Sequence, residues 1–270
     1  MIALNYPQGS EDWLRARLGA CTASRFSDAC GVLKVKSKNG SAGDPNGDAR
    51  AYSWLIAIET VAQEPLDDTF VTYAMRRGRD LEPQARAVYE ARTGAWVEEV
   101  SLILTDDSRF GYSADGFRDD DGLIEIKCPL SCEKLGNVWA NPDEAHLEYI
   151  DQINGGLWIT GRKYCDLIVY CPWLAPVKKD LFVKRIYRNE EAIAALEANL
   201  LRFMRMVDAN LATLRNPTKM TGRSLAAPDL ASTAALGGLD DAPPWEHVAP
   251  VTTRTAPVTD AQLELPANIF

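Results

Sequence analysis

Histidine is nearly absent from this chain, and several motifs that define common enzyme classes are missing. Only two histidines, His146 and His247, occur among 270 residues, which argues against a metal site built on histidine. There is no G-x-S-x-G elbow and no P-loop lysine motif. The sequence therefore indicates neither a histidine-metal hydrolase nor an ATP-driven motor.

Long apolar runs and paired cysteines are also lacking. No stretch approaches the length needed to cross a bilayer, and the first residues lack the basic patch and apolar run of a secretory signal. The six cysteines contain no CxxC pair, and their spacing does not match common iron–sulfur patterns, so reduced thiols are favoured over disulfides. We expect a cytoplasmic protein without a membrane partner.

The net charge of −9 is unusual for a protein that binds nucleic acid, because affinity for DNA comes largely from neutralised phosphates. Lysine and arginine nevertheless occur in short groups, at Arg15 and Arg17, at Lys34, Lys36 and Lys38, and at Arg76, Arg77 and Arg79. A local basic track is therefore compatible with the acidic total.

The length and the periodicity predict one folded domain over residues 1–215 and a flexible tail over 216–270. Helices are predicted at about 11–18, 22–31, 49–63, 70–93, 143–160 and 189–214, and a surface loop at 37–48. Strands are predicted at about 96–104, 110–118, 123–128, 165–171 and 180–187. This order indicates an α/β (α+β) fold, a mixed sheet flanked by helices.

Particular residues in three of these predicted helices carry further expectations. We expect the Thr22 hydroxyl to cap the second helix, and Met75, Leu81, Ala85 and Val88 to form the apolar face of the fourth. Gly155 and Gly156 fall inside a predicted helix, where each costs about 1 kcal/mol relative to alanine. They either permit close approach of another element or break the helix.

The chemistry is suggested by Glu125-Ile126-Lys127 and by Asp115 before it. Strand alternation places Glu125 and Lys127 on the same face, and the turn at 119–122 folds the chain back so that Asp115 approaches Glu125. Two carboxylates and the main-chain carbonyl of Ile126 can hold a hard cation, while Lys127, charged at its ordinary pKa, suits orienting water or phosphate. Alone, the same pattern also fits an ion pair on an exposed hairpin.

Further motifs follow in an order that resembles the phage lambda exonuclease and YqaJ-like viral recombinase family. The segments that carry the resemblance are Trp13-Leu-Arg-Ala-Arg-Leu-Gly19 with Thr22-Ala-Ser24, Gly78-Arg-Asp-Leu-Glu82, Ser113-Ala-Asp-Gly116, Glu125-Ile-Lys-Cys-Pro129, and Tyr149-Ile-Asp-Gln152 with Leu157-Trp-Ile-Thr160. They cover roughly residues 8 to 190. The resemblance implies a restriction-endonuclease-like PD-(D/E)XK core.

The resemblance also implies roles for individual residues. The catalytic group would comprise Lys127, Glu125, Asp115, Glu82 and Gln152. The metal, one or two Mg²⁺ for which Mn²⁺ can substitute, would be held by Asp115, Glu125, the Ile126 carbonyl and Glu82. Contacts to DNA and its 5′ phosphate would come from Arg17, Ser24, Ser113 and Tyr149.

Each of these residues also has an ordinary structural explanation. Glu82 fits a solvated helix glutamate, Arg17 a surface arginine, and Ser24 a capping serine. Tyr149 fits a tyrosine packed beside a core. The order of the motifs, rather than any single residue, favours the functional interpretation.

By this resemblance the chain would be a Mg²⁺-dependent 5′–3′ exonuclease that digests linear duplex DNA from its ends and leaves 3′ overhangs for recombination by strand annealing. The implied partners are double-stranded DNA ends, two further copies in a homotrimeric ring, and a single-strand annealing protein. A docking role is one interpretation of the tail, and an inert solvated segment is the other. Alternatives for the whole chain are a PD-(D/E)XK endonuclease or Cas4-like nuclease, and a non-catalytic DNA-end-binding protein.

Overall fold

The computed structural model describes residues 1–36, 38, 40–66 and 72–216 of the chain. Except for Asn216, the predicted tail at 216–270 lies outside the described residues, as do positions 70 and 71 of the helix predicted at 70–93.

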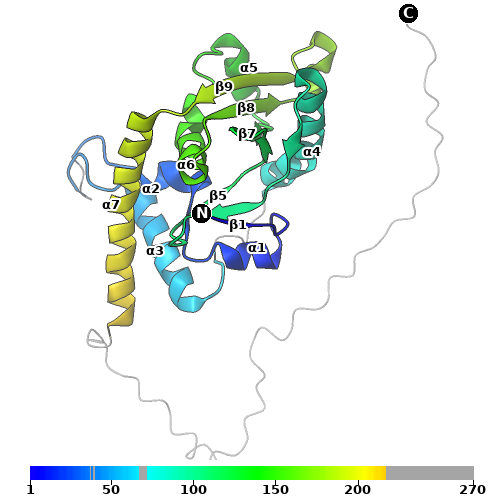
Figure 1. Ribbon diagram of the computed structural model, residues 1–270. Coiled ribbons are helices and arrows are strands. Elements are labelled where there is room, and N and C mark those ends of the chain that lie inside the picture. Colours follow the sequence, from blue (N-terminus) through cyan, green and yellow to red (C-terminus); the bar gives the residue numbers. More distant parts are fainter. Residues whose placement is uncertain (37, 39, 67–71, 217–270) are drawn as a thin grey trace, which may run out of the picture. The chain divides into compact units, whose positions relative to one another are not determined.

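A five-stranded sheet in the order β3-β6-β7-β8-β9 lies at the centre of the fold (Figure 1). Its strands are β3 (Val97–Glu98), β6 (Gly116–Arg118), β7 (Gly122–Lys127), β8 (Tyr164–Tyr170) and β9 (Leu181–Tyr187). β7 and β8 are parallel, and the other pairs are antiparallel. Because parallel neighbours need a crossover, the chain leaves the sheet after Lys127 and returns at Tyr164.

A second sheet, of four strands in the order β1-β4-β5-β2, was not predicted as separate. It contains β1 (Ile2–Leu4), β2 (Cys21–Thr22), β4 (Leu102–Leu104) and β5 (Phe110–Ser113), and only the β2–β5 pair is parallel. The strands predicted at 96–104 and 110–118 each divide between the two sheets. The mixed α/β class with flanking helices is confirmed, but the single sheet is corrected to two mixed sheets.

Helices flank the five-stranded sheet on both sides (Figure 1). The α-helices are α1 (Glu11–Ala16), α2 (Phe26–Ala29), α3 (Gly47–Ala62), α4 (Tyr73–Thr93), α5 (Cys132–Ala140), α6 (Ile150–Thr160) and α7 (Glu190–Arg215), with 3₁₀ turns η1 (Ala23–Arg25), η3 (Leu147–Tyr149) and η4 (Pro172–Val177). In Figure 1, α4 lies on one side of the sheet and α6 and α7 lie on the other. No helix in the described ranges combines the length and apolar character needed to span a bilayer.

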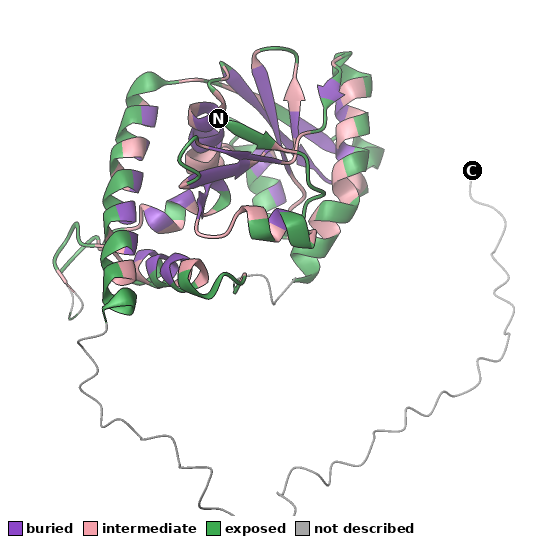
Figure 2. Cartoon of the chain, turned by 60° about the horizontal axis from the view of Figure 1, so that its bottom comes forward, coloured by how far each residue is buried: buried purple, intermediate pink, exposed green. Residues whose placement is uncertain are grey.

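Strand β7 separates two hydrophobic cores. Leu123 faces the larger core, which includes residues of α2, α3, α6 and α7, whereas Ile124 and Ile126 face a smaller core with Ala85 and Tyr89 of α4. Figure 2 shows these buried faces turned inward from the helices onto the sheet. By alternation, Glu125 and Lys127 share the face of Leu123, as predicted.

Several predicted helices differ from those observed. The helix predicted at 22–31 is a 3₁₀ turn followed by the four-residue α2, and Thr22 does not cap it through its side chain. The helix predicted at 143–160 begins only at Ile150, and α5 was not predicted at all. Met75 is 50 % exposed and does not belong to the apolar face of α4.

Two smaller expectations can also be compared with the structure. Positions 37 and 39 of the loop predicted at 37–48 lie outside the described residues. The described part ends at Asn46, whose side chain accepts a hydrogen bond from the Ala49 N–H and so begins α3. All six cysteines are free, in agreement with the predicted reduced thiols.

The buried carboxylate of Asp166 on β8 fixes α4 to the sheet. Its side chain is 2 % exposed and accepts hydrogen bonds from Arg185 Nε (2.7 Å) and Nη2 (2.8 Å), Arg118 Nη1 (2.6 Å) and the Tyr89 hydroxyl (2.6 Å). Burial raises the pKa of Asp166, but these hydrogen bonds outweigh it and leave the pKa below its ordinary value. The network joins β6, β8, β9 and α4 around one charge.

Asp166→Asn should therefore destabilise the fold near neutral pH by about 3 kcal/mol, since both arginines lose their buried partner. Because the folded pKa is depressed, the stabilising effect is complete above the unfolded value of about 3.9 and is lost as the pH falls through the folded value. Urea unfolding at a series of pH values measures the difference between variant and parent, which should shrink in acid.

Asp208→Asn is the matched control, because Asp208 forms an ion pair with Arg109 at 2.7 Å while its side chain is 53 % exposed. Its effect should stay below about 1 kcal/mol. Equal destabilisation by the two substitutions, or a difference for Asp166→Asn that does not change with pH, would contradict the assigned role.

Candidate active site

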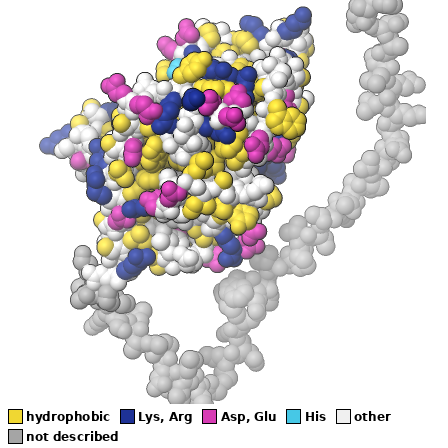
Figure 3. Space-filling view, viewed as in Figure 1, with side chains coloured by type: hydrophobic (Ala, Val, Ile, Leu, Met, Phe, Trp, Pro, Cys, Tyr) yellow, Lys and Arg dark blue, Asp and Glu magenta, His cyan; other side chains and the backbone are white. Residues whose placement is uncertain are grey.

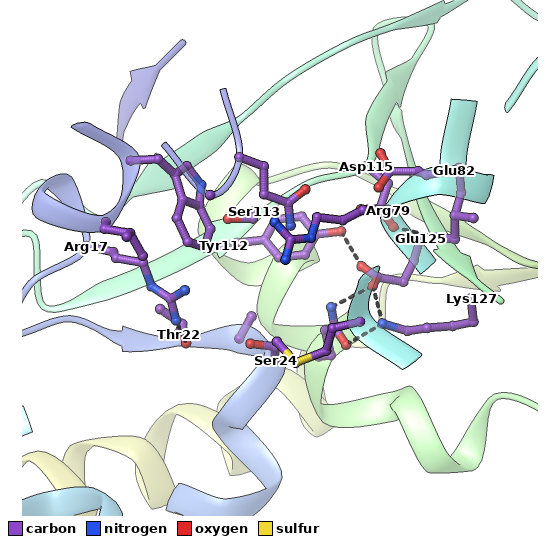
Figure 4. A pocket seen from close by; sticks show the side chains of 18 residues that line it. Arg17, Thr22, Ser24, Arg79, Glu82, Tyr112, Ser113, Asp115, Glu125 and Lys127 are labelled. Carbon is purple, nitrogen blue, oxygen red and sulfur yellow. Dashed lines mark hydrogen bonds and ion pairs between the residues drawn. The ribbon is translucent and has the colours of Figure 1, made fainter. Parts of the chain in front are cut away.

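A cavity of about 370 Å³ opens where the two sheets, α1, α4 and α6 come together. Its lining includes Trp13, Arg17, Thr22, Ser24, Met75, Arg79, Glu82, Tyr112, Ser113, Asp115, Glu125, Ile126, Lys127 and Gln152. In Figure 4, Arg17, Thr22 and Ser24 lie on one side, Glu82, Asp115, Glu125 and Lys127 on the other, and Arg79 between them. Segments far apart in the sequence thus meet around one space.

Glu125 is the most deeply buried charged side chain of the cavity, at 1 % exposure. Its Oε1 accepts hydrogen bonds from Lys127 Nζ (2.7 Å) and Gln152 Nε2 (2.6 Å), and its Oε2 accepts one from the Tyr112 hydroxyl (3.0 Å). Lys127 Nζ also donates to Gln152 Oε1 at 3.0 Å. The interpretation of Glu125 and Lys127 as an exposed surface pair is therefore wrong.

Asp115 lies in the link between β5 and β6, where the chain passes from one sheet to the other. Its Oδ2 accepts a hydrogen bond from the Ile126 N–H at 2.6 Å, which fixes the carboxylate against β7. Burial raises the pKa of Asp115 well above its ordinary value, and the charges of Glu125 and Glu82 raise it further. The predicted approach of Asp115 to Glu125 is observed, although Asp115 follows the strand rather than lying in it.

Glu82 reaches the site from α4 and is held there by Arg86. Arg86 Nη2 donates to Glu82 Oε1 at 2.9 Å and to the Asp115 carbonyl at 3.1 Å, and the arginine also forms an ion pair with Glu99. The pKa of Glu82 is raised above its ordinary value, because burial and the charge of Glu125 together outweigh the lowering by Arg86. Arg86 therefore positions both the helix and the Asp115 link.

Lys127 keeps its positive charge. Burial alone would lower its pKa, but the charges of Glu125 and Asp115 outweigh burial and raise the pKa above the ordinary value. A charged ammonium is what the predicted role of orienting water or phosphate requires, and that role stays a prediction. Its Nζ also lies 5.2 Å from the centre of the Tyr149 ring.

Arg17 and Ser24, two of the residues predicted to bind phosphate, lie on the opposite side of the cavity. Arg17 Nη2 donates to the Thr22 hydroxyl at 3.2 Å, and its guanidinium lies 4.5 Å from the Trp13 ring centre. Ser24 is exposed within η1, so it does not occupy the first turn of an α-helix as predicted. Ser113 also lines the cavity.

Tyr149 is the predicted site residue that the cavity lining does not include, and it approaches the site only through Lys127. In the described part of the chain, no three His, Cys, Asp or Glu side chains form a ready-made metal cluster. The donor set nevertheless suits a hard cation. The charge of Glu125 raises the pKa of Glu82, and the charges of Glu125 and Glu82 raise the pKa of Asp115, so the three carboxylates lie close together and all offer oxygen.

Sequence reasoning missed three residues of the site, Tyr112, Arg86 and Arg79. The i,i+4 spacing of Glu82 and Arg86 was a usable signal, whereas nothing local connects Tyr112 with Glu125. Arg79 is exposed, lines the cavity and forms no ion pair within the described ranges. Its Nη1 lies against Gly9, which has a φ of +82°. A Cβ at Gly9 would lie 2.9 Å from that Nη1 atom.

The two glycines of α6 allow aromatic rings to pack against the helix, and Gly156 leaves the room in which Tyr112 reaches Glu125. A Cβ at Gly155 would lie 2.4 Å from Phe26 Cε2, and a Cβ at Gly156 would lie 2.7 Å from Tyr112 Cζ. Of the two interpretations left open by the sequence, close approach is therefore correct, and α6 is not broken.

Comparison with known proteins places the chain in a family. Residues 12–163 match the model of the YqaJ-like viral recombinase domain, which is more than half of the 270 residues and contains every predicted site residue. The chain belongs to the YqaJ-like viral recombinase family. A search of curated proteins found no match.

Solved structures agree with this assignment. The alkaline exonuclease LHK-Exo from Laribacter hongkongensis is 32 % identical, with 76 % of this chain and 96 % of that chain covered and a TM-score of 0.64. The same exonuclease in complex with dAMP matches with a TM-score of 0.65. A phage-related exonuclease from Haemophilus somnus 129PT, 14 % identical over 72 % of this chain and 96 % of that one, shares the fold with a TM-score of 0.57.

Gly156→Ala should push the Tyr112 ring away from Glu125, because the added methyl group overlaps the ring. We expect a loss of stability of about 1–3 kcal/mol from overpacking, measured by chemical unfolding. Gly136→Ala in α5 is the control, since its Cβ would meet nothing within 4 Å and alanine favours helix by about 1 kcal/mol. Equal stability of the Gly156 variant and the parent would contradict the close packing.

Proposed function

We propose that this chain is a metal-dependent DNA exonuclease of the PD-(D/E)XK type, which hydrolyses linear duplex DNA from 5′-phosphorylated ends. The observation that carries the proposal is the division of one cavity into an acidic side with a charged lysine and a basic side with Arg17. Membership of the family and the similarity to the alkaline exonuclease LHK-Exo support a nuclease.

Asp115, Glu125, the Ile126 carbonyl and Glu82 are the groups that would hold the cofactor, one or two Mg²⁺, for which Mn²⁺ would substitute. These groups fit because they offer hard oxygen ligands and because burial and mutual repulsion raise the pKa of Asp115 and Glu82. When bound there, Mg²⁺ supplies positive charge to the scissile phosphate and makes bound water more acidic.

The protein's own groups prepare the hydrolytic step. Lys127 presents a fixed ammonium toward the phosphate and the attacking water, and Gln152 holds that ammonium at 3.0 Å. Tyr112 and Gln152 fix the Glu125 carboxylate from two sides, so that its orientation does not change during the reaction. Attack of water on phosphorus breaks the P–O bond to the 3′ oxygen of the departing 5′ nucleotide.

Selection of an end follows from the opposite side of the cavity. Arg17 and Ser24 would bind the terminal 5′ phosphate, and the carboxylates then face the next phosphodiester. A volume of about 370 Å³ is at the lower end of small-ligand pockets, about 300–1,000 Å³, which suits one nucleotide rather than a duplex. Digestion would therefore proceed 5′ to 3′, release mononucleotides and leave a 3′ overhang.

Finer proposals rest on the family resemblance and, for the tail, on its mixture of acidic, proline and single large apolar residues. The enzyme would act in the cytoplasm as a homotrimeric ring around DNA, and it would pass the 3′ overhang to a single-strand annealing protein. The tail at 216–270 is the proposed docking segment for that protein. Mass measurement of the native assembly tests the trimer, and truncation after residue 215 with assays of nuclease activity and partner capture tests the tail.

Lys127→Ala should reduce the release of nucleotides from an end-labelled linear duplex by at least about 100-fold, because it removes the fixed positive charge at the phosphate. Chelation of Mg²⁺ should abolish release by the parent. The control is Lys163→Ala. Lys163 is 72 % exposed, pairs with Asp121 and precedes the first residue of β8, whereas Lys127 lies opposite Val169 near the last residue of that strand.

The same assay separates the competing functions. Cleavage of covalently closed circular DNA would indicate an endonuclease or Cas4-like nuclease, because an exonuclease needs an end. Equal activity of Lys127→Ala and the parent would contradict the mechanism, and end binding without hydrolysis by the parent would indicate a DNA-end-binding protein. Release unaffected by a chelator would contradict the metal.

Arg17→Ala should remove the preference for 5′-phosphorylated over 5′-hydroxyl ends, with the KM for phosphorylated ends raised about tenfold through loss of a charge-assisted hydrogen bond. Steady-state kinetics on the two substrates measures this. Arg15→Ala is the control, because Arg15 in the last turn of α1, two residues before Arg17, pairs with Glu11 at 2.9 Å and does not line the cavity. An unchanged preference in Arg17→Ala would refute the assignment.

A further inference from the structure

A second aromatic and basic surface lies outside the cavity, at the ends of β7 and β8. Trp173 in η4 is 64 % exposed, and the Arg77 guanidinium covers one face of its ring at 4.6 Å from the centre. Arg77 Nη1 also donates to the Cys128 carbonyl at 3.0 Å, directly after Lys127. Arg77 therefore contacts both Trp173 and the residue that follows β7, the strand that carries Glu125 and Lys127.

The same turn presents unneutralised positive charge. η4 ends at Lys178, whose φ is +56°, and the Lys179 N–H donates to the Leu174 carbonyl at 3.1 Å, so both lysines belong to a closed turn. Both lysine side chains are exposed. Among the residues that the structure describes, neither Arg77 nor either lysine pairs with a carboxylate.

This local charge contrasts with the protein as a whole, whose net charge is −9. Figure 3 shows that Lys and Arg side chains gather in several small groups among acidic and apolar ones. Lys179 Nζ lies 5.1 Å from the centre of the Trp139 ring, but neither lysine has a carboxylate partner in the described part of the chain. An exposed indole with a stacked guanidinium and two exposed lysines matches what a nucleic-acid strand requires, namely a ring for a base and cations for phosphates.

We propose that Trp173, Arg77, Lys178 and Lys179 form a binding surface for a single strand of DNA, with one unpaired base stacked on the open face of Trp173. The inference rests on the proposed function for the identity of the nucleic acid. A duplex has no free base face at its side, so stacking on Trp173 selects a single strand. Because Arg77 joins the surface to Cys128, a strand bound here passes beside the cavity.

Trp96 provides an internal comparison. It is 82 % exposed, more than Trp173, but it follows the opposite end of α4 and has no cation stacked on its ring within the described residues. Exposure alone therefore does not define the surface, and the combination of an indole with cations does.

The test measures binding of a fluorescently labelled oligothymidylate and of a blunt duplex to the full chain in a chelator, so that hydrolysis does not contribute. Trp173→Ala should weaken binding of the single strand about tenfold and leave duplex binding unchanged. Trp173→Phe should restore most of the affinity, since it keeps an aromatic face. Trp96→Ala should bind both DNAs as the parent does.

A double variant Lys178→Ala with Lys179→Ala tests the phosphate contacts. The slope of log affinity against log salt for the single strand should become shallower by about 1.4, from two contacts at about 0.7 each. An unchanged slope would show that Lys178 and Lys179 do not contact the phosphates and do not belong to the binding surface.

The proposal would be overturned if Trp173→Ala bound the single strand as tightly as the parent does. It would also be overturned if the variant lost affinity for the single strand and the duplex equally. The result is separable from the proposed function. If the parent binds the single strand through Trp173 but digests no DNA, the proposed exonuclease activity is refuted and this binding surface is retained. If the parent digests DNA and Trp173→Ala has no effect on binding, the binding surface is refuted and the exonuclease activity is retained.

Discussion

A carboxylate that leaves water must recover from the protein the hydrogen bonds it gives up, and Glu125 is 1 % exposed. The donors come from three places: Lys127 on the same strand, Tyr112 on the other sheet, and Gln152 on α6. Burial of Glu125 therefore requires both sheets and α6 to be in place. The site is a product of tertiary packing rather than of the Glu-x-Lys segment alone.

The second dependency runs through α4. This helix carries Glu82 and Arg79 into the cavity and Arg77 onto the surface beside it, so its placement determines how all three lie relative to β7. Asp166 anchors the helix at Tyr89, and Arg86 joins it to the Asp115 carbonyl. Because one helix is fixed at several points along its length, stability and site geometry are coupled.

Local pattern was sufficient for the parts of the site that lie within one strand. Alternation placed Glu125 and Lys127 on the same face, and the turn at 119–122 brought Asp115 close to Glu125. Local pattern was insufficient to predict the point at which the chain passes from one sheet to the other. β5 and β6 follow each other with only Ala114 and Asp115 between them, yet they pair with different strands, and periodicity contains no information about the partner.

The missed helix α5 and the role of Gly156 have different physical reasons. Ser131 caps α5 through the Lys134 N–H, so a start signal existed, but Gly136 in its middle and the preceding proline obscured the helical pattern. Gly156 was recognised as unfavourable in a helix, but its benefit depends on Tyr112, which is 44 residues earlier in the chain. Only the folded structure brings the two together.

The acidic total is compatible with binding DNA once distance is considered. At physiological salt, charges separated by more than about 8 Å are largely screened in water, so the net charge of −9 acts weakly on a phosphate at the surface. Under the two proposals, a phosphate would meet the nearest side chains: Arg17 and Arg79, which line the cavity, and Lys178 and Lys179, which are exposed outside it. The buried carboxylates are set apart on one side, where a cation would convert their repulsion into attraction. Local arrangement, and not the sum of charges, therefore determines which polyanion the protein can hold and where.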